Sequence, residues 1–373
     1  MHRALLVDDI VCTILQNVTS SATDVINFAS TCSAISSPAL DTLWCTQSNL
    51  GPLIMCLPQD TWKVGDDNLI DFSREPLPME WQCVRMNTSM IHKLVGNLIG
   101  HSKCPPTLHC CILQRLLAQF PPTSLFPNLV TLDFEIVFDL MEFSSNFLLL
   151  HQFLSPRLEM LAFSVPSIDL PLNKLAKLIL LDVIRDVCLT GHSIADIGHL
   201  RSLQVLALTL HEGSGVLQDS RLMDTPVELS ALNHLGLIAD RMQLCTSFLL
   251  RVITPHLSSI GIKYTKYATP AEVGKFVLSL HASCQSFELE EISIQSYNRP
   301  LYQDLNLYSP LPSHLFRPLL KFRGLKTAKF IAIGNYCLED AAVAWPDIHD
   351  LRFASKETVT SMVTFAAVLS LAS

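Results

Sequence analysis

Residues 203–208 read LQVLAL and residues 232–237 read LNHLGL, and this pattern decides the fold. In both stretches apolar residues stand at the first, fourth and sixth positions. The fourth and sixth residues share one face of an extended chain, because side chains alternate along a strand. The pattern predicts nine short strands, with copies that start at residues 129, 158, 178, 203, 232, 257, 289, 325 and 348.

The spacing of these copies indicates how the strands assemble. They recur on average every ~27 residues, within the 20–29 residues typical of leucine-rich repeats. Helix-like segments lie between them, such as HSIADIGHL from His192 and TPAEVGKFVLSL from Thr269. A strand and a helix repeated at this period stack into a curved α/β solenoid, a horseshoe with parallel strands on its concave side.

One position of the repeat departs from the usual pattern. Leucine-rich repeats commonly carry Asn or Cys at the eighth residue after the first leucine. This chain has His211, Asp240 and Thr265 at that position of three consecutive copies. We therefore expect an irregular solenoid, with irregular turns in place of a hydrogen-bonded side-chain ladder.

Composition excludes several classes of protein. Of the 373 residues, 49% are hydrophobic and 16% are charged, and 26 Lys and Arg stand against 34 Asp and Glu, a net charge of −8. Without a basic cluster, nucleic acid is not expected as a partner. No apolar run reaches the ~18 residues of a membrane helix, and Asp8 and Asp9 interrupt any signal peptide. The 12 scattered cysteines indicate reduced, buried thiols. We expect a cytoplasmic or nuclear protein that does not bind a membrane.

The first 45 residues predict three short amphipathic helices. Apolar residues at helical spacing follow Asp8, a second helix begins near Asp24, and a third opens with Ser37 as N-cap and Pro38 at its first position. The third helix ends on Leu43 and Trp44, directly before GPLIMCLP. These helices have more apolar surface than a core so small can bury. Either a second protein covers that surface, or the helices form a cap that packs against the rest of the chain.

This N-terminal stretch resembles the F-box, a three-helix module that docks on the Skp-type linker protein of SCF ubiquitin ligases. The resemblance lies in the order of apolar positions and in the closing Leu-Trp pair, although Val7 stands where the family has proline and Asp9 where it has glutamate. It implies a set of linker-binding residues, namely Leu6, Ile10, Ile14, Leu15, Val18, Leu40, Leu43 and Trp44.

Two further stretches resemble the F-box/leucine-rich-repeat adaptors, in particular the fungal F-box domain-containing proteins. These are REPLPMEW at residues 74–81 and LFPNL at residues 125–129. The resemblance implies an α/β chain in three parts. Residues 1–58 would form a small all-helical F-box-like module, residues 59–120 a linker with capping helices, and residues 121–373 an irregular leucine-rich-repeat solenoid of about nine repeats.

The sequence offers little for catalysis, so we do not expect an enzyme. The 13 glycines form no phosphate-binding loop, and GHSIA at residues 191–195 lacks the last glycine of a nucleophile elbow. The group of His101, Cys104, His109 and Cys110 matches no familiar zinc spacing and is broken by two prolines. We therefore expect no metal and no cofactor.

A binding surface is what remains. Strand side chains between the apolar positions should line the concave face and hold a protein substrate. We expect an SCF-type substrate adaptor that reaches a cullin-RING complex through the Skp-type linker. The alternative is a leucine-rich-repeat scaffold without a role in ubiquitination. The expected substrate-facing residues are Asp133, Glu135, Thr209, Lys263, Ser293, Gln295, Lys329 and Arg352.

Overall fold

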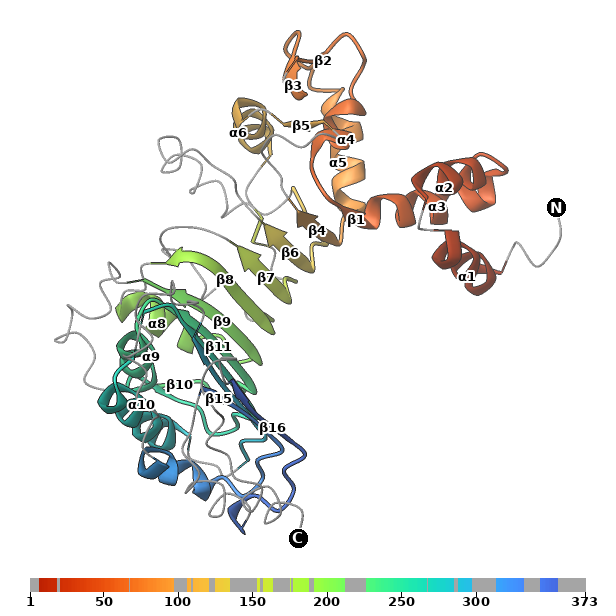
Figure 1. Cartoon of the computed structure of the whole chain (residues 1–373). Helices are drawn as coiled ribbons and strands as arrows, with labels where there is room; N and C mark the ends of the chain where they lie inside the picture. Colours follow the sequence, from red (N-terminus) through yellow and green to blue (C-terminus); the bar gives the residue numbers. More distant parts are fainter. Residues whose placement is uncertain are drawn as a thin grey trace. The chain divides into compact units, whose positions relative to one another are not determined.

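The structure is a computed structural model of the chain (Figure 1). It describes residues 7–18, 21–66, 68–96, 106–108, 110–120, 125–134, 153–154, 157–163, 175, 177–187, 191–211, 226–266, 268–284, 288–296, 313–331 and 343–354. The chain divides into two compact units, Met1–Phe163 and Ser164–Ser373. Within the described ranges, no helix has the length and apolar character needed to cross a membrane.

The first unit opens with three helices, α1 (Asp8–Val18), α2 (Ala22–Ala29) and α3 (Ser33–Cys45). They enclose a small core of Val11, Leu15, Val25, Ile35 and Ala39. The Ser21 hydroxyl caps α2 by accepting from the Asp24 N–H. Three helices are confirmed, but the predicted start of the third at Ser37 is wrong. It begins at Ser33 and contains Pro38, because the residues before the proline also pack on the core.

A second layer of the first unit surrounds a three-stranded sheet. In this sheet β2 pairs antiparallel with β3, and β3 pairs parallel with β5. Trp81 at the start of α5 lies edge-on to both Phe72 and Phe120, with ring centroids 6.0 Å apart in each pair. The elements are α4 (Gly51–Met55), β2 (Trp62–Val64), β3 (Leu69–Phe72), α5 (Trp81–Met90), β5 (Thr107–Leu108) and α6 (Cys110–Gln119).

Parallel pairing carries the repeats in both units. In the first unit the strand order is β1 (Thr46–Gln47), β4 (Lys93–Gly96), β6 (Thr131–Phe134) and β7 (Met160–Phe163). Because β1 and β4 precede residue 121, parallel strands begin earlier than the predicted repeat region. They fall in the N-terminal segment and in the segment for which we expected a linker and capping helices.

The second unit continues the pattern with seven parallel strands in the order β8, β9, β11, β13, β14, β15 and β16. Each of the nine predicted repeat strands is present, β6 and β7 of the first unit included, and each begins two residues after the first leucine or isoleucine of its copy. The strands are β8 (Leu180–Val187), β9 (Val205–Leu210), β11 (His234–Ala239), β13 (Ser259–Tyr264), β14 (Glu291–Ser296), β15 (Thr327–Ile331) and β16 (Asp350–Ala354).

Helices lie on one side of these seven strands (Figure 1). Helix α9 contacts β11, and α10 contacts both α9 and the 3-10 helix η6. The 3-10 helix η6 contains Pro318. The remaining elements of the second unit are α8 (Gly191–Gly198), β10 (Val227–Glu228), α9 (Met242–Leu249), β12 (Val252–Ile253), α10 (Pro270–Ser283) and η6 (Ser313–Lys321).

Alternation along each strand produces the core. In β9 the side chains of Leu206, Leu208 and Leu210 are buried, and the residues between them are half-buried. The same alternation recurs in β11 and β13, which pair with their neighbours over six residues in register. The buried row of each strand faces the helices, so the other row forms a second sheet face, which we call the open face.

One turn geometry repeats before the strands. The Gln204 carbonyl accepts hydrogen bonds from the N–H groups of Asn233 and His234, at 2.8 and 2.9 Å. The Asn233 carbonyl accepts in the same way from Ser258 and Ser259, at 2.8 and 3.0 Å. Because one carbonyl binds two successive amides of the next repeat, the strands joined in this way start in the same register. The same arrangement uses the carbonyls of His92, Val130, Ile179, Ser258, Glu290 and Lys326.

The opposite ends of β9, β11 and β13 are also linked, which the sequence did not predict. His211 Nδ1 lies 2.9 Å from Asp240 Oδ2, and the Thr265 hydroxyl lies 3.4 Å from Asp240 Oδ1. Backbone hydrogen bonds join the same strand ends. The Asp240 N–H donates to the Leu210 carbonyl at 3.1 Å, and the Thr265 N–H donates to the Ala239 carbonyl at 3.0 Å. The expectation of irregular turns is therefore wrong for these three repeats, because a polar ladder forms there with side chains other than asparagine.

Candidate docking surfaces

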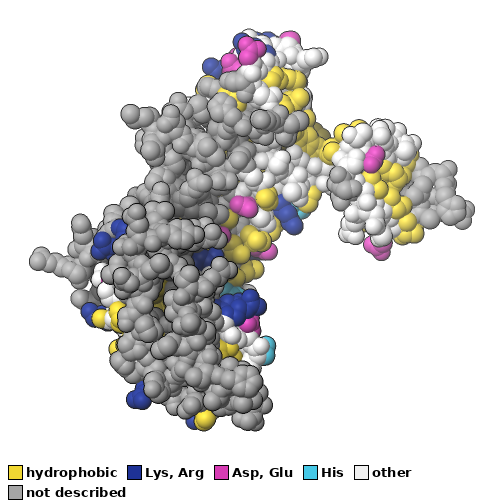
Figure 2. All heavy atoms as spheres, in the orientation of Figure 1, with side chains coloured by type: hydrophobic (Ala, Val, Ile, Leu, Met, Phe, Trp, Pro, Cys, Tyr) yellow, Lys and Arg dark blue, Asp and Glu magenta, His cyan; other side chains and the backbone are white. Residues whose placement is uncertain are grey.

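The helical module carries a groove between α2 and α3. Its cavity volume is about 230 Å³. Ile26 and Leu40 flank it and are 50% and 40% exposed, although both are large and apolar. Figure 2 shows hydrophobic side chains running along one face of this module. The lining residues are Val25, Ile26, Ala29, Ser30, Ser36, Ala39, Leu40 and Leu43.

The origin of the groove can be followed in the sequence of α2. Val25 and Ala29 lie four residues apart, so both face the core side of α2. Ile26 follows Val25 directly and therefore points away from the core. Adjacent residues of a helix do not share a face, so Val25 is buried in the core while Ile26 stays 50% exposed. Exposed apolar surface therefore remains between α2 and α3, where a partner could cover it.

The predicted linker-binding residues divide into two groups. Ile10 and Leu40 are exposed, and Ile14, Val18 and Leu43 are half-buried, so these five reach the surface. Leu6 lies outside the described residues. The surface roles predicted for Leu15 and Trp44 need correction, because these side chains are only 1% and 7% exposed.

Packing explains both corrections. Leu15 lies in the core of the three helices beside Val11. Trp44 ends α3 where that helix contacts α5 and leads into β1, so its ring is enclosed by the first unit itself. Sequence reasoning also missed the contribution of α2, whose Val25, Ile26 and Ala29 line the groove. The available signal was the dense apolar content of that short helix.

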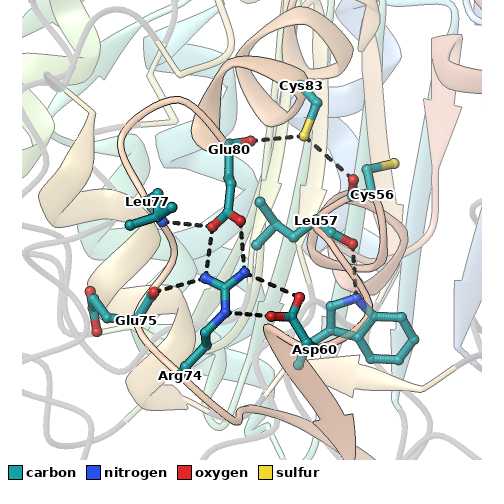
Figure 3. Close-up of polar contacts among 9 residues, drawn as sticks. Cys56, Leu57, Asp60, Arg74, Glu75, Leu77, Glu80 and Cys83 are labelled. Carbon is teal, nitrogen blue, oxygen red and sulfur yellow. Dashed lines mark hydrogen bonds and ion pairs between the residues drawn. The ribbon is translucent and has the colours of Figure 1, made fainter.

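The REPLPMEW stretch forms a polar clamp in the first unit (Figure 3). Arg74 binds the Asp60 carboxylate at 2.7 and 3.1 Å and the Glu80 carboxylate at 2.7 and 2.9 Å. Glu80 also accepts the Leu77 N–H at 2.6 Å. Bidentate pairing of this kind fixes orientation as well as charge. The clamp therefore holds the loop that leads into α5 against the segment that follows α4.

The clamp shifts the titration of its members. Hydrogen bonds from Arg74, with a further one from the Leu77 N–H, hold the pKa of Glu80 below its ordinary value. The Arg74 hydrogen bond likewise lowers the pKa of Asp60, and the two carboxylates raise the pKa of Arg74. All three groups are therefore charged at neutral pH, as a structural ion-pair network requires.

The LFPNL stretch also has a structural role. The Asn128 side chain donates to the Ser89 carbonyl at 2.7 Å and accepts from Arg157 at 2.7 Å. Phe126 stacks on Phe153 with ring centroids 5.3 Å apart. These contacts connect α5 to the repeats that contain β6 and β7. Both motifs that carried the family resemblance therefore stabilise the first unit from within.

The open face of the strands holds most of the predicted substrate-facing residues. Glu135 lies outside the described residues. Each of the other seven occupies a strand position that alternates with the buried row: Asp133, Thr209, Lys263, Ser293, Gln295, Lys329 and Arg352. Asp133 lies in the first unit and the other six lie in the second, and their contact with a substrate remains a prediction.

Charges on the last strands, and on the residues directly before them, are arranged in pairs. Lys326 Nζ lies 2.6 Å from Glu290, Lys329 Nζ lies 3.6 Å from Glu291, and Arg352 Nε lies 2.8 Å from Asp350. Nearby carboxylates therefore balance these three cations.

Metal chemistry finds no support in the part of the chain that the structure describes. No group of three or more His, Cys, Asp and Glu there could hold a metal ion. The side chains of His101, Cys104, His109 and Cys110 lie outside what the structure describes. Cys245 and Cys284 are buried, and burial raises the pKa of both thiols, to about 12 for Cys245. These two thiols act as small apolar side chains.

The fold and these surfaces define a mixed α/β repeat protein with parallel strands and two candidate surfaces for protein binding. No family model matches the sequence, and no curated protein matches it. Among solved structures the chain is similar to an internalin (inlF) from Listeria monocytogenes, at 13% identity and a TM-score of 0.28, over 74% of this chain and 86% of that chain. The repeat architecture therefore rests on the strand pairing and turn geometry described above.

Proposed function

We propose that the chain is a non-catalytic adaptor of an SCF-type ubiquitin ligase. In this proposal the helical module docks on a Skp-type linker protein, and the repeats hold a protein substrate. The observation that carries it is the apolar groove between α2 and α3, with Ile26 and Leu40 half exposed beside it. Large apolar side chains around a groove mark protein contacts more often than ordinary surface.

The mechanism is proximity. A substrate held by the repeats is carried to the cullin-RING complex through the linker, so its lysines meet the transferring enzyme at a raised effective concentration. The chain itself contributes binding surfaces and no reacting group. Its repeats can vary their open-face residues without disturbing the buried leucines, because the two rows alternate along each strand.

The alternative is a protein-binding repeat scaffold without a role in ubiquitination. The burial of Leu15 and Trp44 favours it, since these two side chains stabilise the first unit and are not left for a partner. The two functions differ in the occupant of the groove. An adaptor presents the groove to the linker, and a scaffold leaves it to another protein.

Co-purification of the full chain with a co-expressed Skp-type linker tests the proposal. The wild type should retain the linker, and Ile26→Lys with Leu40→Lys should reduce the retained linker at least tenfold, because two charges would then lie in an apolar contact. Leu278→Lys on α10 is the matched control, since Leu278 is 61% exposed and lies outside the groove. Thermal unfolding of each variant checks that it remains folded.

Two results would contradict the adaptor function. If the wild type does not retain the linker, the scaffold alternative stands. If the groove variant retains the linker as the wild type does, the docking surface lies elsewhere on the chain.

A further inference from the structure

An apolar and a cationic side chain lie side by side on the open face of the second unit. Ile238 in β11 pairs in register with Lys263 in β13. Thr209 in β9 pairs with Ile238, and Gln295 in β14 pairs with Lys263, so the four residues form one row that runs across the strands. Ile238 is 43% exposed and Lys263 is also exposed. Neighbouring strands are ~4.8 Å apart, so one bound segment can touch both side chains.

The charge at this place is unbalanced. Elsewhere on the open face, Lys329 and Arg352 each lie within 3.6 Å of a carboxylate. Lys263 has no such partner among the described residues, and its direct neighbours in the row are Ile238 and Gln295. A carboxylate from another molecule is the group that would complement it.

The next row across the strands, two residues earlier in β11 and β13 and on the same face, leaves room for that molecule. It contains Gly236 and Gly261, paired in register with each other. A Cβ atom built on Gly261 would meet nothing within 4 Å, so no neighbouring side chain requires glycine there. Neither glycine has a positive φ, so the backbone does not require glycine either. A partner can therefore approach the strand closely beside Lys263.

We infer that the partner bound by the repeats is an acidic protein segment with an apolar side chain next to a carboxylate. The apolar side chain packs on Ile238 above Gly261, and the carboxylate pairs with Lys263. This inference rests on the proposed protein-binding role of the repeats and names the class of partner. It is independent of the groove between α2 and α3.

Fluorescence anisotropy with the full chain tests the inference. The probes are two labelled nine-residue peptides in a glycine-serine background, each with two phenylalanines, one with three glutamates and the other with three lysines. The glutamate peptide should bind at least tenfold more tightly than the lysine peptide. Lys263→Glu should weaken its binding at least tenfold, and Gly261→Leu should do the same by filling the open space.

A charge-matched control separates local from general electrostatics. Lys275→Glu lies on the exposed side of α10 and should change binding less than twofold. Equal binding of the two peptides would overturn the inference, and so would equal losses in Lys263→Glu and Lys275→Glu. Co-purification of the linker should not respond to Lys263→Glu, so failure of the adaptor proposal and failure of this inference give different results.

Discussion

His211 and Asp240 occupy the same position of consecutive repeats, and their side chains meet at 2.9 Å between Nδ1 and Oδ2. Thr265 holds that position in the next repeat, and its hydroxyl lies 3.4 Å from both the Asp240 carbonyl and Oδ1. Asp240 therefore accepts from both sides. Three repeats are tied together at the ends of their strands by this one carboxylate.

Asp240→Ala should reduce the free energy of unfolding by about 1–3 kcal/mol, because His211 and Thr265 lose a shared, half-buried acceptor. Asp240→Asn keeps one acceptor oxygen and should lose less than half as much. Urea unfolding followed by circular dichroism measures both variants. Equal losses in the two variants would show that the side-chain acceptor is not what stabilises the ladder.

The Arg74 clamp predicts acid sensitivity in the first unit. The folded-state pKa values of Glu80 and Asp60 are lowered, so their stabilisation is complete above the unfolded-state values, about 4.3 for Glu and 3.9 for Asp. It is lost as the pH falls through the folded-state values. The thermal midpoint of the wild type, followed by tryptophan fluorescence, should therefore fall more between pH 5 and pH 3 than that of Arg74→Met.

Arg85→Met is the control for this measurement, because Arg85 is an exposed cation on the same helix α5. It should retain the acid dependence of the wild type. If Arg74→Met and the wild type respond equally to acid, the clamp does not govern the stability of this unit.

Helix α10 depends on a reciprocal cap. The Glu272 N–H donates to the Thr269 hydroxyl at 3.3 Å, and the Thr269 N–H donates to the Glu272 carboxylate at 2.7 Å. Thr269→Ala should cost about 1 kcal/mol of unfolding free energy, whereas Thr269→Ser keeps the cap. Chemical denaturation measures the difference. A serine variant as unstable as the alanine variant would contradict a capping role for the hydroxyl.

The buried thiols should resist alkylation. Burial raises the pKa of Cys245 to about 12, so almost no thiolate forms at pH 8. Iodoacetamide should label the exposed Cys12 in the native chain and should label Cys245 only after denaturant is added. Peptide mass spectrometry measures both sites. Rapid native labelling of Cys245 would show that the packing between α9 and its neighbours opens readily.

The repeat strands could be predicted because one local rule places every side chain of a strand. The leucines at positions 206 and 208 are buried in β9, as the spacing of LQVLAL indicates, and the same holds for positions 235 and 237 in β11. The residues between them fall on the open face by the same alternation. The placement of Thr209 and Lys263 follows directly from it.

The helical module was harder to predict, because its surfaces depend on contacts between segments. Helical spacing marks Leu15 and Trp44 as apolar, and it does so equally for Leu40. Packing of α1 on α3 and of α3 on α5 buries the first two, while Leu40 stays 40% exposed. Spacing in one helix cannot distinguish a side chain covered by its own chain from one left for a partner.

The sequence alone determined the order and inward-facing residues of the nine predicted repeat strands, because alternation and repeat period act over a few neighbouring residues, but it did not predict β1 and β4. Only the tertiary structure decided which apolar residues of the helical module remain exposed, how Arg74 joins Asp60 to Glu80, and how Asp240 serves its two neighbours. Those arrangements join residues far apart along the chain, so they exist only after the backbone has brought the partners within hydrogen-bonding distance.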